Sequence, residues 1–288
     1  MSAAIVTPTS HDLKRRRRRR TAVRGVLLAI CFVYLAILLL VPLGGITWTV
    51  LVSGWQNIRE TFGQPDVRHA FLLTGVISVI TVSVVTIFGV IVAWVLARQR
   101  FRGRALLNAI VDLPFAVSPV TVGLMALLLF GTGGWFQSFF DARGISIIFA
   151  LPSMVLVTIF ISIPFVIREV APVLEEVGTE EEDAARTLGA SSWKSFRKVT
   201  LPNIRWALLY GIALSTARSI GEIGAVLLVS GAIQGQTETA TLYIFRALEE
   251  RQEPSAYLVA LTLAAVSIVL LVVIETSKRR RTKIREDI

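Results

Sequence analysis

The 288-residue sequence has very little of what metalloproteins and disulfide-bonded proteins depend on. It contains one cysteine, Cys31, and two histidines, His11 and His69, that lie far apart in the chain. A single cysteine cannot form an internal disulfide. Because no cysteine lies near either histidine, the ligand spacing that zinc sites need is missing, and we expect no metal centre.

Signatures of nucleotide binding and hydrolysis are also absent. The sequence has no G-x-x-x-x-G-K-[ST] phosphate-binding loop, no G-x-S-x-G nucleophile elbow and no H-E-x-x-H pair. We therefore expect that the chain binds no cofactor and is not an enzyme on its own. Glu222 is the one clear acid inside an apolar stretch, and it has no evident acid–base partner, so a membrane-embedded enzyme is the least favoured class.

Long apolar runs dominate what is present, with 54% hydrophobic residues and a mean hydropathy of +0.68. Runs of 18 or more apolar residues are typical of membrane-spanning helices. We therefore predict an all-α polytopic membrane protein, with a basic segment at 1–23, a membrane domain at 24–275 and a basic tail at 276–288. Six transmembrane helices are expected, over about 25–52, 69–97, 108–130, 145–167, 204–230 and 256–275.

The distribution of positive charge predicts how these helices cross the membrane. Cytoplasmic segments carry an excess of Lys and Arg. If the N-terminus is inside, the inside segments hold 24 of the 30 Lys and Arg residues and the outside loops hold five. Both termini are therefore predicted to be cytoplasmic. The inside segments in this arrangement are 1–24, 98–107, 168–205 and 276–288.

Six consecutive arginines, Arg15 to Arg20, precede the first apolar run. Such a run can bind nucleic acid or anionic lipid. It can equally anchor the topology of the helix that follows, and this second interpretation is favoured because that helix comes next in the chain. No nucleic-acid partner is expected.

The polar segment 168–203 contains the clearest helix signals outside the apolar runs. Thr179 and Glu182 have the spacing of a capping box, and acidic residues fill the first turn that follows. Gly189 suits the left-handed position that ends a helix. We predict a short surface helix over about 180–188, a second cap at Ser191 or Ser192, and a departure from helical geometry before Pro202. A capped helix facing the cytoplasm is a suitable docking element for a partner protein.

The run 204–230 is chemically unusual because polar residues recur along one face. Ser215, Arg218, Ser219 and Glu222 have the spacing i, i+3, i+4, i+7, and the small residues Gly211 and Ala225 extend that face. Charged residues inside a membrane normally face a water-filled path or one another. The face is predicted either to line a translocation path or to lock helices together, and Arg218 and Glu222 are predicted to contact each other.

Two prolines interrupt the run 108–130. Pro114 and Pro119, with Ser118 between them, free backbone carbonyls and kink the helix. Irregular backbone at membrane depth occurs where it is buried or lines a cavity. Ser118 and Pro119 are therefore candidates for the same path, with a simple kink in a curved bundle as the slightly favoured alternative.

The residues from Asp183 to Pro202 resemble a family pattern. Asp183-Ala184-Ala185, then Gly189, Val199 and Leu201-Pro202 have the spacing of the cytoplasmic signature in membrane subunits of bacterial ABC importers, with Asp and Val where the usual form has Glu and Ile. The resemblance implies that 168–203 is a coupling loop between helices 4 and 5. Its short helix would dock on a separate ATPase, through Glu182, Asp183, Ala184, Ala185, Leu188 and Gly189.

A narrower resemblance covers most of the chain. Residues 112–119, 217–225 and 229–237 are similar to the oxyanion-importer branch, and most similar to the second, W-type permease of sulfate/thiosulfate importers. The resemblance implies a permease in the bacterial plasma (inner) membrane that works with two copies of an ATPase using ATP and Mg²⁺. It also implies a second, T-type permease and an extracytoplasmic sulfate-binding protein as partners. The chain itself would be in contact with membrane lipid.

Two other functions are kept as alternatives. A molybdate or tungstate importer has the same architecture, and nothing in charge or spacing separates its cargo from sulfate. An ion-coupled secondary carrier that uses Glu222 as its ion site is a different class, and the absence of an evident internal repeat argues against it.

Overall fold

A computed structural model describes the backbone of residues 10–286 and the side chains of residues 24–276. The chain divides into two compact units, residues 1–54 and 55–288. The first unit holds one continuous helix, α1 (Ser10–Val52), with Pro42 inside it, and residues 24–52 of this helix are apolar enough to cross a membrane. The side chains of Arg15 to Arg20 lie outside the described residues, so the two interpretations of that run stay predictions.

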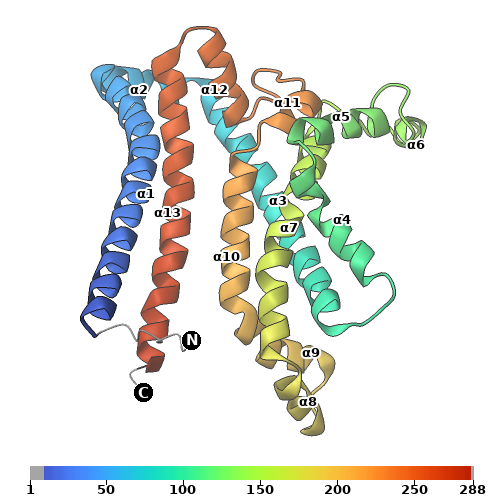
Figure 1. The fold of residues 1–288 in the computed structure, drawn as a ribbon. Coiled ribbons are helices and arrows are strands. Elements are labelled where there is room, and N and C mark those ends of the chain that lie inside the picture. The colour runs from blue at the N-terminus through green and yellow to red at the C-terminus, as the bar shows by residue number, and fades with distance from the viewer. Residues whose placement is uncertain (1–9, 287–288) are drawn as a thin grey trace, which may run out of the picture. The chain divides into compact units, whose positions relative to one another are not determined.

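The second unit consists of helices joined by loops, with no strand among its described residues (Figure 1). Proline lies in the first turn of α3, α5 and α7, where its missing N–H costs nothing because those N–H groups have no helical partner. Its elements are α2 (Gly54–Gly63), α3 (Pro65–Arg98), α4 (Arg104–Ala116), α5 (Pro119–Phe130), α6 (Gln137–Asp141), α7 (Leu151–Val177), α8 (Glu180–Thr187), α9 (Ser192–Ser195), a π-helical turn (Phe196–Thr200), α10 (Leu201–Ile220), α11 (Gly224–Ser230), α12 (Ala240–Glu249) and α13 (Glu253–Glu286).

Four helices in the described part of the chain are long and apolar enough to span a membrane, and six spans result if each of two bent helix pairs counts as one. The bent pairs are α4 with α5, at 109°, and α10 with α11, at 53°. The kink predicted at Pro114 and Pro119 is therefore a complete break, and it falls at Val117 and Ser118. Pro114 itself is accommodated inside α4.

One predicted boundary was wrong. The fourth apolar run was expected over about 145–167, but α7 begins at Leu151 and continues to Val177. Arg168 therefore belongs to a membrane helix and not to a loop, and it forms a salt bridge with Asp112 of α4. The segment 231–255, between the fifth and sixth predicted helices, contains α12, which packs in the core through Leu242 and Tyr243.

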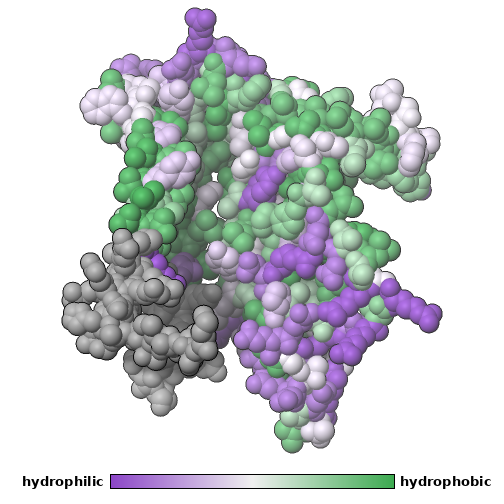
Figure 2. Space-filling model, in the orientation of Figure 1, coloured by the Kyte–Doolittle hydropathy of each residue, from purple (hydrophilic) through white to green (hydrophobic). Residues whose placement is uncertain are grey.

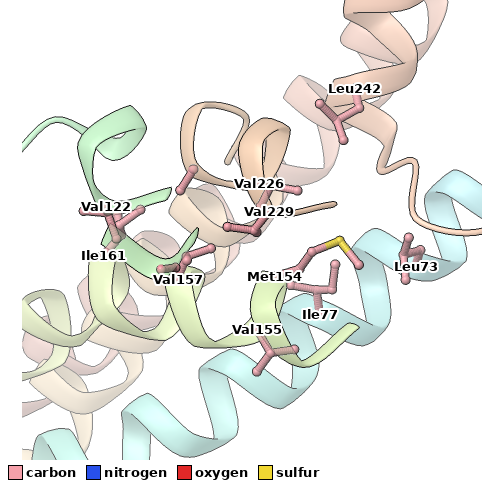
Figure 3. Close-up of a cluster of buried hydrophobic side chains, with 12 residues drawn as sticks. Leu73, Ile77, Val122, Met154, Val155, Val157, Ile161, Val226, Val229 and Leu242 are labelled. Carbon is pink, nitrogen blue, oxygen red and sulfur yellow. The ribbon is translucent and has the colours of Figure 1, made fainter. Parts of the chain in front are cut away.

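The core of the second unit surrounds the two helix breaks. Leu73 and Ile77 of α3 and Met154 of α7 meet Val226 and Val229 of α11 (Figure 3). A second cluster joins α3, α7 and α10 toward the α8 end, around Val85, Val166 and Ile204. The stiff pair α3 and α7 thus forms a frame against which the broken helices pack.

Glycines permit the closest helix contacts. A Cβ at Gly89 of α3 would lie 2.7 Å from Val166 Cγ1 of α7, and one at Gly211 of α10 would lie 3.0 Å from the Val166 Cα. Gly123 of α5 lies directly against α11, where an added Cβ would come within 2.8 Å of the carbonyl oxygen of Ala225. Small residues therefore allow these backbones to approach, as membrane helix packing requires.

Candidate functional site

The first candidate site is the short helix α8, which extends with α9 from one end of the second unit (Figure 1). It covers Glu180–Thr187, and the predicted helix over 180–188 is confirmed. Gly178 (φ +68°) and Gly189 (φ +82°) have left-handed backbone conformations on either side of it. These angles are strained for other residues, so the two glycines define where α8 begins and ends.

The predicted capping box is wrong. The Thr179 side chain makes no capping hydrogen bond, and Glu182 turns away from the helix N-terminus. Arg98, at the end of α3, binds the Glu182 carboxylate in place of the helix N-terminus, since its Nη2 donates to Glu182 Oε1 at 3.1 Å. Thr200 donates to the same oxygen at 3.0 Å, and Arg98 Nη1 donates to the Leu174 carbonyl of α7 at 2.6 Å. Glu182 is thus an internal anchor and does not face outward.

The outward side of α8 carries the remaining residues of the sequence signature. Asp183, Ala184, Leu188 and Gly189 are exposed, and Ala185 is half-buried. Leu188 is 88% exposed and Trp193, which follows it in α9, is 70% exposed. Two large apolar side chains beside acidic residues at a helix tip form a surface suited to binding another protein.

The segment after α8 confirms one prediction and contradicts another. Ser191 caps α9, because its hydroxyl accepts a hydrogen bond from the Lys194 N–H at 3.4 Å. The expected departure from helical geometry before Pro202 does not occur: Leu201 is helical, and its N–H reaches back to the Phe196 carbonyl. The wider π-helical turn over Phe196–Thr200 accommodates the proline without ending the helix.

The second candidate site is the junction of α10 and α11. Arg218 Nη1 lies 2.6 Å from Glu222 Oε2, so the predicted contact is confirmed as an ion pair. Glu222 lies in the break itself, where Oε1 also accepts the Ala225 N–H at 2.9 Å. Its side chain is 2% exposed and that of Arg218 is 29% exposed. The carboxylate therefore caps α11 while it fixes the arginine.

The other members of the predicted polar face bind neighbouring helices. Ser215 is buried and donates to the Ser162 carbonyl of α7 at 3.5 Å. Ser219 is buried and donates to Ser78 of α3 at 3.1 Å. These contacts fit the interpretation as a lock between helices.

Arg218 also opens into a cavity of about 480 Å³ at the break between α4 and α5. Ser118 and Pro119 line this cavity with it, so the structure brings together three residues singled out from two separate runs. Ile161 and Phe165 of α7 form the opposite wall. The result is a cavity between candidate membrane helices, with one cation and an interrupted helix on its boundary, features that membrane proteins keep away from lipid.

Sequence reasoning missed three residues around these sites. Arg98 was counted only as part of a basic cluster, and nothing in its spacing indicates a buried pairing with α8. Asp112 and Arg168 form a salt bridge between α4 and α7, with Nη2 and Oδ1 2.6 Å apart. Their positions, 56 residues apart, become a pair only once the two helices pack, and the polar character of each was the only available signal.

Comparisons with known proteins agree in both sequence and fold. Residues 85–282 match the family model described as "Binding-protein-dependent transport system inner membrane component". The chain is 45% identical over 258 residues to the sulfate transport system permease protein CysW of Synechocystis sp., covering 90% of this chain and 94% of the relative. It is 44% identical over 236 residues to CysW of Escherichia coli K12, covering 82% and 81%. It is 39% identical over 248 residues to CysT of the same bacterium, covering 86% and 89%.

Solved structures support the fold. A chain of a bacterial alginate ABC transporter, crystallised with an alginate-bound periplasmic protein, aligns with a TM-score of 0.76 at 18% identity. The alignment covers 93% of this chain and 98% of the other. The all-α fold is therefore shared with a chain of that transporter.

Proposed function

We infer that this chain, which belongs to the binding-protein-dependent transport system inner membrane component family, is the W-type permease subunit of an ATP-driven sulfate or thiosulfate importer. The observation that carries the proposal is the α8 surface, where the sequence signature 183–189 lies on an exposed helix between two left-handed glycines. The cargo is inferred from the relatives, which are named as sulfate permeases. ATP and Mg²⁺ are used by a separate ATPase.

The proposed complex contains two permeases and two ATPase copies, supplied by an extracytoplasmic sulfate-binding protein. A T-type protein is the natural second permease, because this chain resembles both named types and resembles W-type more closely. The exposed side of α8, with Asp183, Ala184, Leu188 and Gly189, docks on an ATPase. Glu182 supports this surface from behind through Arg98 and does not itself contact the partner.

We test the docking surface with Gly189→Asp. The φ of +82° at this position is strained for aspartate, so the end of α8 must rearrange. Uptake should be lost and the ATPase should co-purify poorly, with the permease still present in the membrane. Gly63→Asp adds the same charge at the exposed end of α2, where φ is not left-handed, and should leave uptake intact. Normal uptake with Gly189→Asp would exclude the coupling role.

The proposed topology has six spans, with both termini and α8 in the cytoplasm of a bacterial inner membrane. It places 1–23, the segment from the end of α7 to residue 203, and 276–288 on the cytoplasmic side of a membrane domain at 24–275. In a Cys31→Ser background, a membrane-impermeant thiol reagent added outside should label Trp135→Cys and spare Leu188→Cys. The opposite labelling would invert the topology.

An assay of the assembled complex in liposomes identifies the transported ion. Sulfate carried by its binding protein should stimulate ATP hydrolysis and enter the liposome. Stimulation by molybdate or tungstate instead would identify the closely related importer. Uptake that persists without ATP and collapses with the ion gradient would identify a secondary carrier that uses Glu222.

Within this transporter, the cavity at Arg218 is proposed to be part of the translocation path, with Ser118 and Pro119 on its wall. Glu222 holds Arg218 in place, and Ser215 and Ser219 fix α10 to its neighbours. Both interpretations of the polar face therefore apply, each to different residues. Arg218 lines the translocation path, and Ser215 and Ser219 lock the helices together.

A further inference from the structure

Helix α4 carries a polar stripe that no lipid-facing surface would carry. Arg104, Asn108 and Asp112 are spaced four residues apart, so they lie along one face. The Asp112 side chain is 52% exposed and that of Arg104 is 40% exposed. Leu106, Ile110 and Leu113, which are exposed and apolar, lie on another face of the helix, and the exposed Phe115 at the end of the stripe lines the cavity. Because charged residues in a membrane face a partner or a water-filled path, the polar stripe must be directed away from lipid.

Helix α7 supplies a matching stripe, and two ion pairs join them. Arg168 donates through Nε to Asp112 Oδ1 at 2.8 Å, and its Nη2 lies 2.6 Å from the same oxygen. Arg104 donates to Glu175 Oε1 at 2.7 Å. Neither pair is buried, since the Arg168 side chain is 39% exposed and that of Glu175 is 52% exposed.

The ion pairs continue from the cavity that holds Arg218. Ile161 and Phe165 line that cavity, and Arg168 and Glu175 follow them on the same side of α7. From Ile161 to Glu175 the helix rises about 21 Å, which reaches from the cavity to the α8 end. Figure 2 shows hydrophilic residues continuing from the α8 end over the region of α4 and α7.

We propose that Arg218, Arg168 and Arg104 form a series of exchange sites for the transported oxyanion, resting on the proposed sulfate function. At Arg168 and Arg104 the guanidinium binds the dianion by releasing the exposed carboxylate that it binds at rest, whereas Arg218 keeps the buried Glu222 as its partner. A guanidinium fork suits a tetrahedral oxyanion, because two N–H groups can donate to two oxygens at once.

The carboxylates that bind these arginines at rest, Asp112 and Glu175, raise the rate at which the anion leaves each site. A lone arginine would hold a dianion too firmly, and conduction requires sites that bind strongly enough to admit an ion and weakly enough to release it. Asp112 and Glu175 compete for the arginines, so binding of sulfate at each site replaces one ion pair with another. The arginine is never left unpaired, which keeps the steps between sites small.

The decisive variant is Asp112→Asn/Arg168→Gln. Two amides can still hydrogen-bond between α4 and α7, so the helix contact survives while both charges are lost. In liposomes that contain the complete complex, with labelled sulfate, its binding protein and ATP, uptake should fall about tenfold or more, as expected for the loss of a charge-assisted contact. Sulfate-stimulated ATP hydrolysis should stay within about twofold of the original rate.

Two single variants and one control sharpen the test. Arg168→Lys keeps the charge and loses the fork, so its uptake should lie between the original and the double variant. Asp112→Asn alone should also slow uptake, because Arg168 then retains the anion. Arg102→Gln removes an exposed arginine from the loop before α4 and should leave uptake unchanged.

Two results would overturn the proposal while leaving the transporter assignment intact. In one, the original complex imports sulfate and the double variant does so within about twofold of it. In the other, uptake and ATP hydrolysis fall together, which identifies the pair as a structural lock. Absence of sulfate uptake by the original complex would instead reject the proposed function itself.

Discussion

Replacing Glu182 should detach α8 from the membrane helices without unfolding α8 itself. The carboxylate is 7% exposed and binds Arg98, which is 8% exposed, so removing it leaves a buried guanidinium without its counter-charge. Breaking a buried ion pair from one side costs about 3–5 kcal/mol. Glutamine keeps an oxygen that can accept from Arg98 and Thr200, so Glu182→Gln should cost about 1.5–3 kcal/mol and Glu182→Ala the full amount.

The assay is hydrogen exchange of the α8 amides, combined with a double-mutant cycle. Glu182→Ala should accelerate exchange over 180–187 far more than over α7, because the loss is local. Together with Arg98→Met, the unfolding free energies in detergent should give a coupling energy of about 1.5–3 kcal/mol, since the double variant leaves no unpaired charge. Glu181→Gln is the matched control, because this residue of the same turn is exposed and accepts a hydrogen bond from Asn203, so the change should cost under about 1 kcal/mol.

A coupling energy below about 0.5 kcal/mol would refute the reasoning, since the two residues would then act independently. Unchanged exchange in α8 after Glu182→Ala would refute it in another way. Either result would mean that α8 is held mainly by the chain connections at its two ends.

Three further predictions concern other contacts. Gly123→Ala should destabilise the solubilised permease by about 1–3 kcal/mol, because the added carbon meets the Ala225 carbonyl, whereas Gly75→Ala on α3, with nothing within 4 Å, should be neutral or slightly stabilising. Glu238→Gln should lower the melting temperature. The Glu238 carboxylate is 1% exposed, accepts two hydrogen bonds from Arg246 and raises the pKa of that guanidinium. The variant would leave the arginine charged and without this counter-charge. Trp193→Ser should weaken co-purification of the ATPase while the melting temperature of the permease stays unchanged, because the side chain is 70% exposed; a drop in melting temperature would show that it supports the fold instead.

The sequence was sufficient for features that depend on neighbours along the chain. Apolar runs predicted the helical membrane class, and Gly189 predicted the end of α8, because a left-handed residue needs no tertiary contact to be recognised. The Arg218–Glu222 contact follows from spacing on one helix in the same way. These predictions are local, and they hold.

The failures depend on contacts between distant segments. Glu182 has the spacing of a capping partner, but the arginine at the end of α3, 84 residues away, offers a full charge in place of a backbone N–H. Arg168 looked like the first residue of a polar loop, but α7 continues past it because Ile167, Val170 and Leu174 are buried against neighbouring helices. The angle between α4 and α5 at Ser118 also depends on packing, since a proline predicts that a helix bends but not by how much.

The two broken helices have a mechanical consequence. Gly224 at the start of α11 approaches Pro119 at the start of α5, where an added carbon would lie 3.1 Å from the proline Cβ, and Gly123 approaches Ala225 just beyond. The breaks α4–α5 and α10–α11 are therefore in direct contact, so that a rotation at one would displace the other. Two independent breaks would allow four combinations of bent and straight states, whereas two breaks in contact leave two. If the proposed path opens at these two breaks, we therefore expect them to move together.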